Sequence, residues 1–202
     1  MGVSRLLLLR HGESVWNAEG RWQGWADPPL SSVGRQQAAE AATRLRRDGF
    51  SAVAASDLRR ARHTAELIAR GLGLSAEVHT DAGLREYDLG AWSGLTRAEI
   101  EADWPAELAD WRHGRVDSAP GGEARDAFLD RLVAATGRVA AAYPGRSVLV
   151  ISHGGAIGTL ERFLGIKPRR PVHLGGRWIH ASTGGLRAGP ERLVLQPDGP
   201  AP

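Results

Sequence analysis

The stretch SVLVISHGG at residues 147–155 decides the fold class. It begins with a continuous apolar run from Val148 to Ile151, which is typical of a parallel strand covered on both faces. The run passes directly into His153-Gly154-Gly155, and a helical pattern follows. A strand that leads straight into a helix is the repeating unit of a parallel α/β sheet, so this stretch predicts an α/β protein.

Similar apolar runs recur along the chain, with helical patterns between them. The predicted strands are Arg5–Leu9, Ala52–Ala55, Ala76–His79, Ser147–Ser152 and Arg192–Gln196. The predicted helices run from a Ser31 cap to about Arg47, from an Asp57 cap to about Arg70, from about Glu123 to Ala142, and from after His153 through Ile157, Leu160, Phe163 and Leu164. We expect a three-layer α/β sandwich, with a mostly parallel sheet and helices on both faces.

The chain length of 202 residues suits one domain with its own core. We expect residues 1–196 to form this single domain and residues 197–202, which are rich in proline, to be a disordered tail. Residues from about 90 to 120 fit the alternation poorly and hold Trp92, Trp104 and Trp111. This segment carries two short helical patterns, so we predict a helical insertion that lies near the functional site of the protein.

Composition excludes several classes of protein. Hydrophobic residues make up 42% and charged residues 24%, as in ordinary globular proteins, and there is no cysteine for a disulfide or a thiolate nucleophile. The net charge is only +3 and the arginines alternate with acids, which argues against a nucleic-acid partner. The run Leu6–Leu9 is too short for a signal peptide or a membrane span. We expect a cytoplasmic protein with no membrane partner.

Three predicted strand ends carry residues that suit an anion. Arg10-His11, Arg59-Arg60 and His153 each follow a strand. In a parallel sheet the carboxyl ends of the strands meet at one edge, where ligands bind and helix N-termini begin. Guanidinium and imidazole groups at such an edge predict a phosphate pocket. A structural role for each histidine, and a simple tight turn at Gly154-Gly155, remain as alternatives.

Four blocks of sequence, in their order along the chain, narrow the class of protein. They are LRHGES at residues 9–14 with its continuation to residue 38, SDLRRA at 56–61, LRE with GAWSGL at 84–86 and 90–95, and ISHGG at 151–155. Together they resemble the signature of the histidine phosphatase superfamily, which includes the cofactor-dependent phosphoglycerate mutases. The resemblance covers about residues 5–165 and implies a phosphoglycerate mutase-like fold.

The resemblance also implies a role for each matching residue. It makes His11 the nucleophile, Glu86 the proton donor, Arg10, Arg60 and His153 the ligands of the phosphoryl oxygens, and Asn17, Gln23, Gly24 and Gly154 the lining of the substrate region. It implies no metal and no bound organic cofactor. Phosphoryl transfer is consistent with these roles. Arginines lower the pKa of an imidazole nucleophile and offset the charge of the phosphoryl group. The leaving group then needs a proton, which an acid such as Glu86 supplies.

The resemblance implies a metal-independent phosphatase that hydrolyses a small phosphorylated metabolite and releases inorganic phosphate. The alternative is a phosphoglycerate mutase, but the 67 positions from Glu86 to His153 are few for a mutase, and Arg112 matches only one arginine of the pair that mutases carry. A remote alternative is a protein that binds phosphorylated ligands without catalysis. A homodimer is an open alternative to a monomer.

Other residues near the blocks have two interpretations. Trp16, Trp22, Trp25 and Trp92 either form an apolar rim over the pocket or pack in the core. Arg112 and Arg115 are candidates for binding a second acidic group of the substrate, such as a carboxylate. Glu123 is interpreted as an acid in the first turn of a helix, with a structural role only.

Overall fold

The computed structural model describes residues 2–74, 77–168 and 171–195, which contain one six-stranded sheet. The strands are β1 (Ser4–Arg10), β2 (Ala52–Ala55), β3 (His79–Thr80), β4 (Ser147–Ser152), β5 (Gly175–Ser182) and β6 (Gly185–Leu193). Their order in the sheet is β3-β2-β4-β1-β5-β6. The first four in that order are parallel, and β5 and β6 pair antiparallel at one side. The sheet is therefore mostly parallel, as expected.

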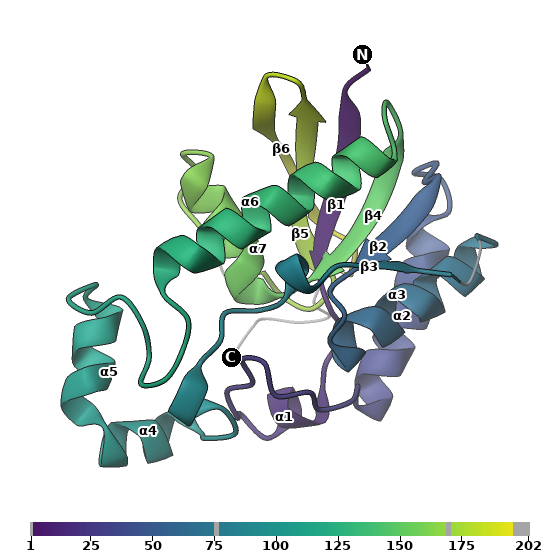
Figure 1. Ribbon diagram of the computed structural model, residues 1–202. Helices are drawn as coiled ribbons and strands as arrows, with labels where there is room; N and C mark the ends of the chain where they lie inside the picture. The colour runs from purple at the N-terminus through teal and green to yellow at the C-terminus, as the bar shows by residue number, and fades with distance from the viewer. Residues whose placement is uncertain (1, 75–76, 169–170, 196–202) are drawn as a thin grey trace.

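Helices cover both faces of this sheet. They are α1 (Val15–Ala18), α2 (Ser32–Leu45), α3 (Arg59–Leu72), α4 (Arg97–Asp103), α5 (Pro105–Arg112), α6 (Arg125–Ala142) and α7 (Gly154–Phe163), with 3₁₀ turns η1 (Ala82–Leu84) and η2 (Gly90–Trp92). Figure 1 shows α6 crossing one face, whereas α2 and α3 pack on the other. The expected three-layer sandwich is confirmed. The short helices α4 and α5 extend away from the sheet beside α1 (Figure 1).

The strand side chains explain why both faces are covered. Leu6 and Leu8 of β1 belong to the core cluster under α6 and α7, and Leu7 and Leu9 belong to the cluster under α2 and α3. The apolar residues of β4 alternate in the same way, with Leu149 in register with Leu7. Because successive side chains of a strand point to opposite faces, a continuous apolar run needs a helical layer on each side.

The helix caps were predicted with mixed success. Ser31 caps α2 as expected, since its Oγ accepts a hydrogen bond from the Gly34 N–H at 3.0 Å. The prediction that Asp57 caps α3 is wrong. The Arg59 N–H donates instead to Asp27 Oδ1 at 2.7 Å. Asp57 is held by a charge-assisted pair of hydrogen bonds from Arg85, at 2.6 and 2.7 Å, which are stronger than a neutral cap.

The antiparallel side of the sheet was predicted less well than its centre. β2 and β4 have the predicted bounds, but β5 was missed, and the last strand runs over Gly185–Leu193 instead of Arg192–Gln196. β6 is largely exposed, so it lacks the apolar run on which the prediction depended. The predicted strand Ala76–His79 begins outside the described residues, and β3 starts only at its end. The predicted tail at residues 197–202 also lies outside them.

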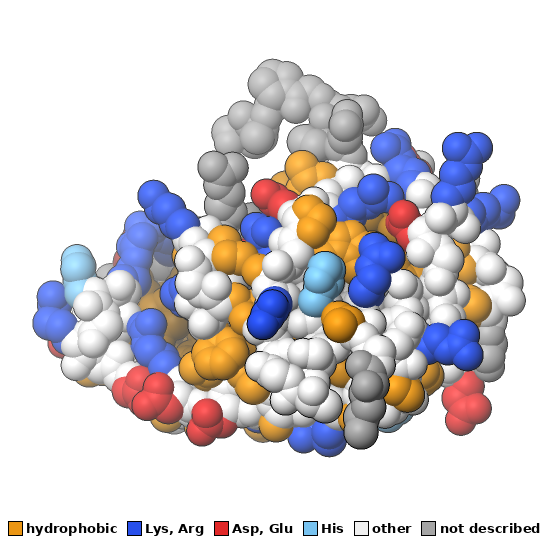
Figure 2. All heavy atoms as spheres, turned by 90° about the horizontal axis from the view of Figure 1, so that it is seen from above, with side chains coloured by type: hydrophobic (Ala, Val, Ile, Leu, Met, Phe, Trp, Pro, Cys, Tyr) orange, Lys and Arg blue, Asp and Glu red, His pale blue; other side chains and the backbone are white. Residues whose placement is uncertain are grey.

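Basic side chains are dispersed on the face at the amino ends of the parallel strands. Figure 2 shows Lys and Arg side chains separated there by uncharged and hydrophobic atoms, with no single continuous stripe. This arrangement agrees with the alternation of charges along the sequence. Among the described residues, no helix combines the length and the apolar character that a membrane crossing requires.

Candidate active site

Two neighbouring parallel strands bring two histidines to one edge of the sheet. β1 ends at Arg10 and is followed by His11, and β4 ends at Ser152 and is followed by His153. The His11 backbone N–H donates to the Ser152 carbonyl at 3.0 Å, which joins the two strand ends. The rings of His11 and His153 then lie 5.1 Å apart between centroids, edge to face at 64°. Both strands run toward the same edge of the sheet, on the side where α1 lies (Figure 1).

The His11 ring is fixed in one tautomer. Its Nδ1–H donates to the Gly12 carbonyl at 2.6 Å, so Nε2 is the nitrogen that carries the free lone pair. The side chain lines the cavity described below, although only 3% of the residue is exposed. Burial, followed by the charges of Arg60 and Arg10, holds the pKa of His11 well below its usual value of 6.5. The ring is therefore a neutral imidazole with Nε2 available for attack.

The loop that carries His11 uses its backbone polar groups in hydrogen bonds. The Gly12 N–H donates to Thr64 Oγ1 at 3.1 Å, and that hydroxyl donates to the Arg60 carbonyl at 2.7 Å. His173 Nδ1–H donates to the His11 carbonyl at 3.0 Å. The sequence analysis missed Thr64 and His173, because only the packing of α3 and of the segment before β5 brings them to this loop.

The guanidinium of Arg60 is buried at the cavity wall. It is 1% exposed, and it donates from Nη1 to the Ala26 carbonyl at 2.8 Å and from Nη2 to the Gly24 carbonyl at 2.9 Å. Nε has no partner among the described residues. Burial lowers the pKa of Arg60 to about 10, although the charges of Glu86 and Asp27 oppose this shift. Arg60 is thus still a cation near neutral pH, with donors that remain for a ligand.

His153 lies next to His11, with the two ring centroids 5.1 Å apart. It is fully buried and is absent from the residues that line the cavity. Neither ring nitrogen has a hydrogen-bond partner among the described residues, and burial, followed by the charges of Arg60 and His11, lowers its pKa well below 6.5. Buried polar atoms without partners are rare in proteins, and a ligand at His11 is one group that could supply the partner.

The carboxylate of Glu86 lies at the start of α7. Oε2 accepts a hydrogen bond from the Gly155 N–H at 2.9 Å, and Oε1 accepts one from the Tyr87 N–H at 3.0 Å. A side chain at position 155 would place its Cβ only 2.4 Å from Oε1, so this approach requires glycine. The first turn of α7 therefore binds a carboxylate of the protein itself.

A cavity of about 1000 Å³ collects the candidate residues. Eight of the nine residues selected from the sequence line it, namely Arg10, His11, Asn17, Gln23, Gly24, Arg60, Glu86 and Gly154. Asn17 and Gln23 are tied to Ser14, since Asn17 Oδ1 accepts from its N–H at 3.2 Å and Gln23 Oε1 from its hydroxyl at 2.8 Å. The ninth, His153, is fully buried and is not among the lining residues.

The cavity is strongly positive. Its lining includes six arginines, Arg10, Arg21, Arg60, Arg112, Arg125 and Arg162, but only two acids, Glu86 and Asp126. Within the described part of the chain, no group of three or more His, Asp or Glu side chains is placed to hold a metal ion. Guanidinium groups are well suited to bind phosphate oxygens.

The tryptophans divide between core and cavity. Trp92 is fully buried in the core, whereas Trp22 lines the cavity together with Trp111. Trp25 is 39% exposed, and its Nε1–H donates to the Glu86 carbonyl at 2.8 Å. Of the tryptophans for which core and rim were both open, Trp92 lies in the core and Trp22 lines the cavity.

Two interpretations of charged residues are corrected. Glu123 precedes α6 and is not in its first turn; it forms a bidentate ion pair with Arg131, at 2.6 and 2.8 Å. Arg115 pairs with Asp110 at 2.7 Å and does not line the cavity, whereas Arg112 does. Asp110 lies in the last turn of α5, and the chain that follows the helix turns back so that Arg115 contacts it. The spacing of the two residues alone did not indicate this contact.

The fold and this site define an α/β enzyme that handles phosphate groups at the carboxyl edge of its sheet. The sequence model described as "Histidine phosphatase superfamily (branch 1)" matches residues 6–188. The chain therefore belongs to the histidine phosphatase superfamily, branch 1, and is a histidine phosphatase.

The relatives are named for both of the activities considered above, phosphatase and mutase. A glucosyl-3-phosphoglycerate phosphatase of Mycobacterium tuberculosis is 39% identical over 172 residues, covering 81% of this chain and 76% of that protein. Phosphoglycerate mutase-like protein 4 of Arabidopsis thaliana is 39% identical over 160 residues, covering 78% and 69%. The solved structure of a mycobacterial glucosyl-3-phosphoglycerate phosphatase with VO3 has a TM-score of 0.78 at 32% identity, covering 92% and 96%.

Proposed function

We propose that the protein is a metal-independent phosphatase that hydrolyses a small phosphate monoester through a phosphohistidine on His11. The observation that carries the proposal is the hydrogen bond from His11 Nδ1–H to the Gly12 carbonyl, which leaves a neutral Nε2 beside the buried Arg60 cation. A neutral imidazole is a competent nucleophile, and a fixed cation stabilises the charge of the transferring phosphoryl group.

In the first step, Nε2 of His11 forms a bond to phosphorus as the bond from phosphorus to the leaving oxygen breaks. Glu86 takes up a proton when the negatively charged substrate enters the cavity, gives this proton to that oxygen, and an alcohol departs. Arg10 and Arg60 line the same cavity and bind the phosphoryl oxygens. His153 joins them in the phosphorylated state, since both of its ring nitrogens are without a partner in the described residues.

In the second step, water attacks phosphorus and the bond from phosphorus to Nε2 breaks. The carboxylate of Glu86 accepts the proton from this water, which restores its protonated form. The product is inorganic phosphate, and His11 returns to the neutral imidazole that its surroundings favour. No proton or electron is left over after the cycle.

The substrate of this proposal is a phosphorylated metabolite with a second acidic group. The cavity is much larger than a phosphate group needs and has an excess of arginines. Of these, Arg112 belongs to the insertion, and Arg125 donates to the carbonyl of Trp111 in the insertion. Aromatic side chains from Tyr87, Trp111 and Phe128 form part of the same wall, which suits the apolar face of a sugar or a similar group. The relatives named for glucosyl-3-phosphoglycerate agree with this class.

A phosphoglycerate mutase is the second candidate, because a relative that is also 39% identical to this chain is named phosphoglycerate mutase-like protein 4. One observation disfavours it. A mutase would use a pair of arginines in the insertion to hold the substrate carboxylate, but only Arg112 lines the cavity, and Arg115 is paired with Asp110.

The test is a panel of phosphate monoesters incubated with the protein in excess chelator, with free phosphate and isomerised product both measured. The proposal expects free phosphate from the wild type and none above background from His11→Ala. Isomerisation that depends on a bisphosphorylated primer would establish the mutase instead. Binding of phosphate esters without either product would establish the non-catalytic alternative.

A further inference from the structure

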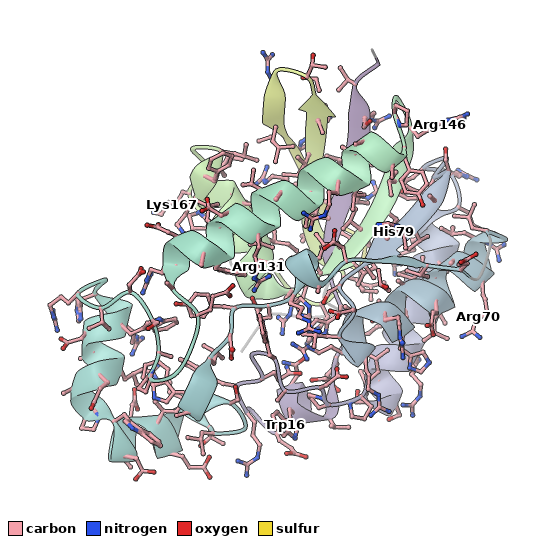
Figure 3. All side chains as sticks on the ribbon, viewed as in Figure 1. Trp16, Arg70, His79, Arg131, Arg146 and Lys167 are labelled. Carbon is pink, nitrogen blue, oxygen red and sulfur yellow. The ribbon has the colours of Figure 1, made fainter. Side chains whose placement is uncertain are left out.

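We infer that Arg131 is a positioning residue for the proton donor Glu86, so that its removal weakens proton donation more than it weakens phosphoryl binding. This inference rests on the proposed function, in which Glu86 is the proton donor. It concerns a residue of α6 that does not line the cavity. Figure 3 shows Arg131 projecting from α6 toward η1, at the beginning of the segment that carries Glu86.

The Arg131 guanidinium uses all five of its N–H donors. Nη1 donates to the carbonyls of Gly83 and Arg85 at 3.0 and 2.9 Å, and Nη2 donates to the carbonyl of Glu86 at 2.7 Å. The remaining two donors, on Nε and Nη2, hold the Glu123 carboxylate. Three carbonyls of one short segment thus converge on a single planar cation, which fixes the backbone on which Glu86 is carried.

Glu123 and Trp25 hold this guanidinium in place. The Glu123 pair is largely buried, with side-chain exposures of 19% for Arg131 and 13% for Glu123, so water weakens it little. The Trp25 ring centroid lies 5.0 Å from the guanidinium carbon of Arg85 and 5.6 Å from that of Arg131, within the range of cation–π contacts. Trp25 also donates to the Glu86 carbonyl, so two independent donors hold that one oxygen.

The position of the Glu86 backbone affects catalysis because the Glu86 carboxylate is held by its neighbours. Its two oxygens accept from the Gly155 and Tyr87 N–H groups, and the Cβ position of Gly155 is within 2.4 Å of Oε1. A shift of the Glu86 backbone would therefore move the carboxyl away from α7 and from the leaving oxygen. A misplacement of about 1 Å in a reacting group can cost about 100-fold in rate.

The experiment compares two substrates that differ in their need for an acid. An alkyl phosphate has a poor leaving group and needs the proton from Glu86, whereas p-nitrophenyl phosphate has a good leaving group and needs it little. We expect Arg131→Gln to lower kcat for the alkyl phosphate by about 10- to 100-fold. We expect kcat for p-nitrophenyl phosphate to fall by less than about 3-fold, because His11 and Arg60 are untouched.

The matched control is Arg138→Gln. Arg138 lies on the same helix and grips the start of the same segment through two hydrogen bonds to Asp81, both 2.8 Å, but it does not contact Glu86. It should leave the ratio of the two kcat values unchanged. In a Glu86→Gln background, Arg131→Gln should change kcat for the alkyl phosphate by less than about 2-fold, because the two residues act as one unit.

Equal losses on both substrates, or no loss on either, would overturn the positioning role. A further 10-fold loss in the Glu86→Gln background would do the same. If Arg131→Gln does not fold, the ratio is measured for Glu123→Gln, which keeps the shape of the partner and removes its charge. Failure of the proposed function itself is separate, since it would appear as p-nitrophenyl phosphatase activity that survives His11→Ala.

Discussion

Replacing Gly155 with alanine tests the placement of Glu86 with a single methyl group. The new Cβ would lie 2.4 Å from Glu86 Oε1, about 1 Å closer than an ordinary van der Waals contact, and 3.1 Å from Glu86 Cδ. The carboxyl must yield, because position 155 is held by the first turn of α7. The fold should survive, since alanine in a helix is favoured over glycine by about 0.5–1 kcal/mol.

The expected effect on catalysis is large. A displacement of about 1 Å corresponds to about 100-fold in kcat, or about 2.7 kcal/mol in the activation free energy. The assay is steady-state release of inorganic phosphate from an alkyl phosphate, together with a thermal melt. We expect Gly155→Ala to lose activity while its melting temperature stays within a few degrees of the wild type.

Gly137 of α6 provides the control, because a Cβ at that position meets nothing within 4 Å. Gly137→Ala should keep full activity. A Gly155→Ala variant that folds and keeps kcat within about 3-fold of the wild type would contradict the role of Glu86, since proton donation is worth about 10²–10⁴ in rate and depends on where the donor lies.

Three further predictions concern protonation and stability. NMR of the ring nitrogens should show His11 neutral, with the proton on Nδ1, at a pH well below 6.5, and Arg10→Gln should raise its pKa; a ring that titrates at 6.5 or above contradicts this. His11 and His153 stay neutral in the folded state, whereas the same histidines in the unfolded chain bind protons below about pH 6.5. The free energy of unfolding should therefore fall as the pH drops below 6.5. Denaturant titrations that find this free energy unchanged would refute the prediction. Thr64→Val leaves the Gly12 N–H without its partner and should cost about 1–3 kcal/mol in calorimetry, with Thr64→Ser near wild type; a valine variant as stable as the serine variant argues against it.

The centre of the fold could be predicted because its signal is local. The runs Ala52–Ala55 and Ser147–Ser152 are buried on both faces, so their apolar residues mark the strand bounds in the sequence. The antiparallel side could not be predicted in the same way. β5 contains Arg177, which is stabilised there by Glu161 at 2.7 Å, a partner that only the folded chain supplies.

Residues at the strand ends could be placed from sequence for a similar reason. His11 and His153 follow buried strands, and the order of parallel strands then brings them together. Residues that act by holding these groups gave no local signal. Thr64, His173 and Arg131 each reach the site from another element, through hydrogen bonds to backbone carbonyls or N–H groups that the sequence does not record.

The depth of His153 was also beyond sequence reasoning. A histidine at a strand end can line a cavity or be buried beside it, and the local sequence does not distinguish the two. Here His11 lines the cavity, whereas His153, with its ring centroid 5.1 Å from that of His11, is fully buried.

The most direct measurement is the capture of the covalent intermediate. The protein is mixed with a labelled phosphate monoester, quenched in alkali after milliseconds, and digested for mass spectrometry of the peptide that contains His11. We predict one phosphoryl group on Nε2 of His11, formed and lost fast enough to account for turnover and absent from His11→Ala. A turnover that proceeds with no phosphorylated histidine, or with the label on another residue, would contradict the account.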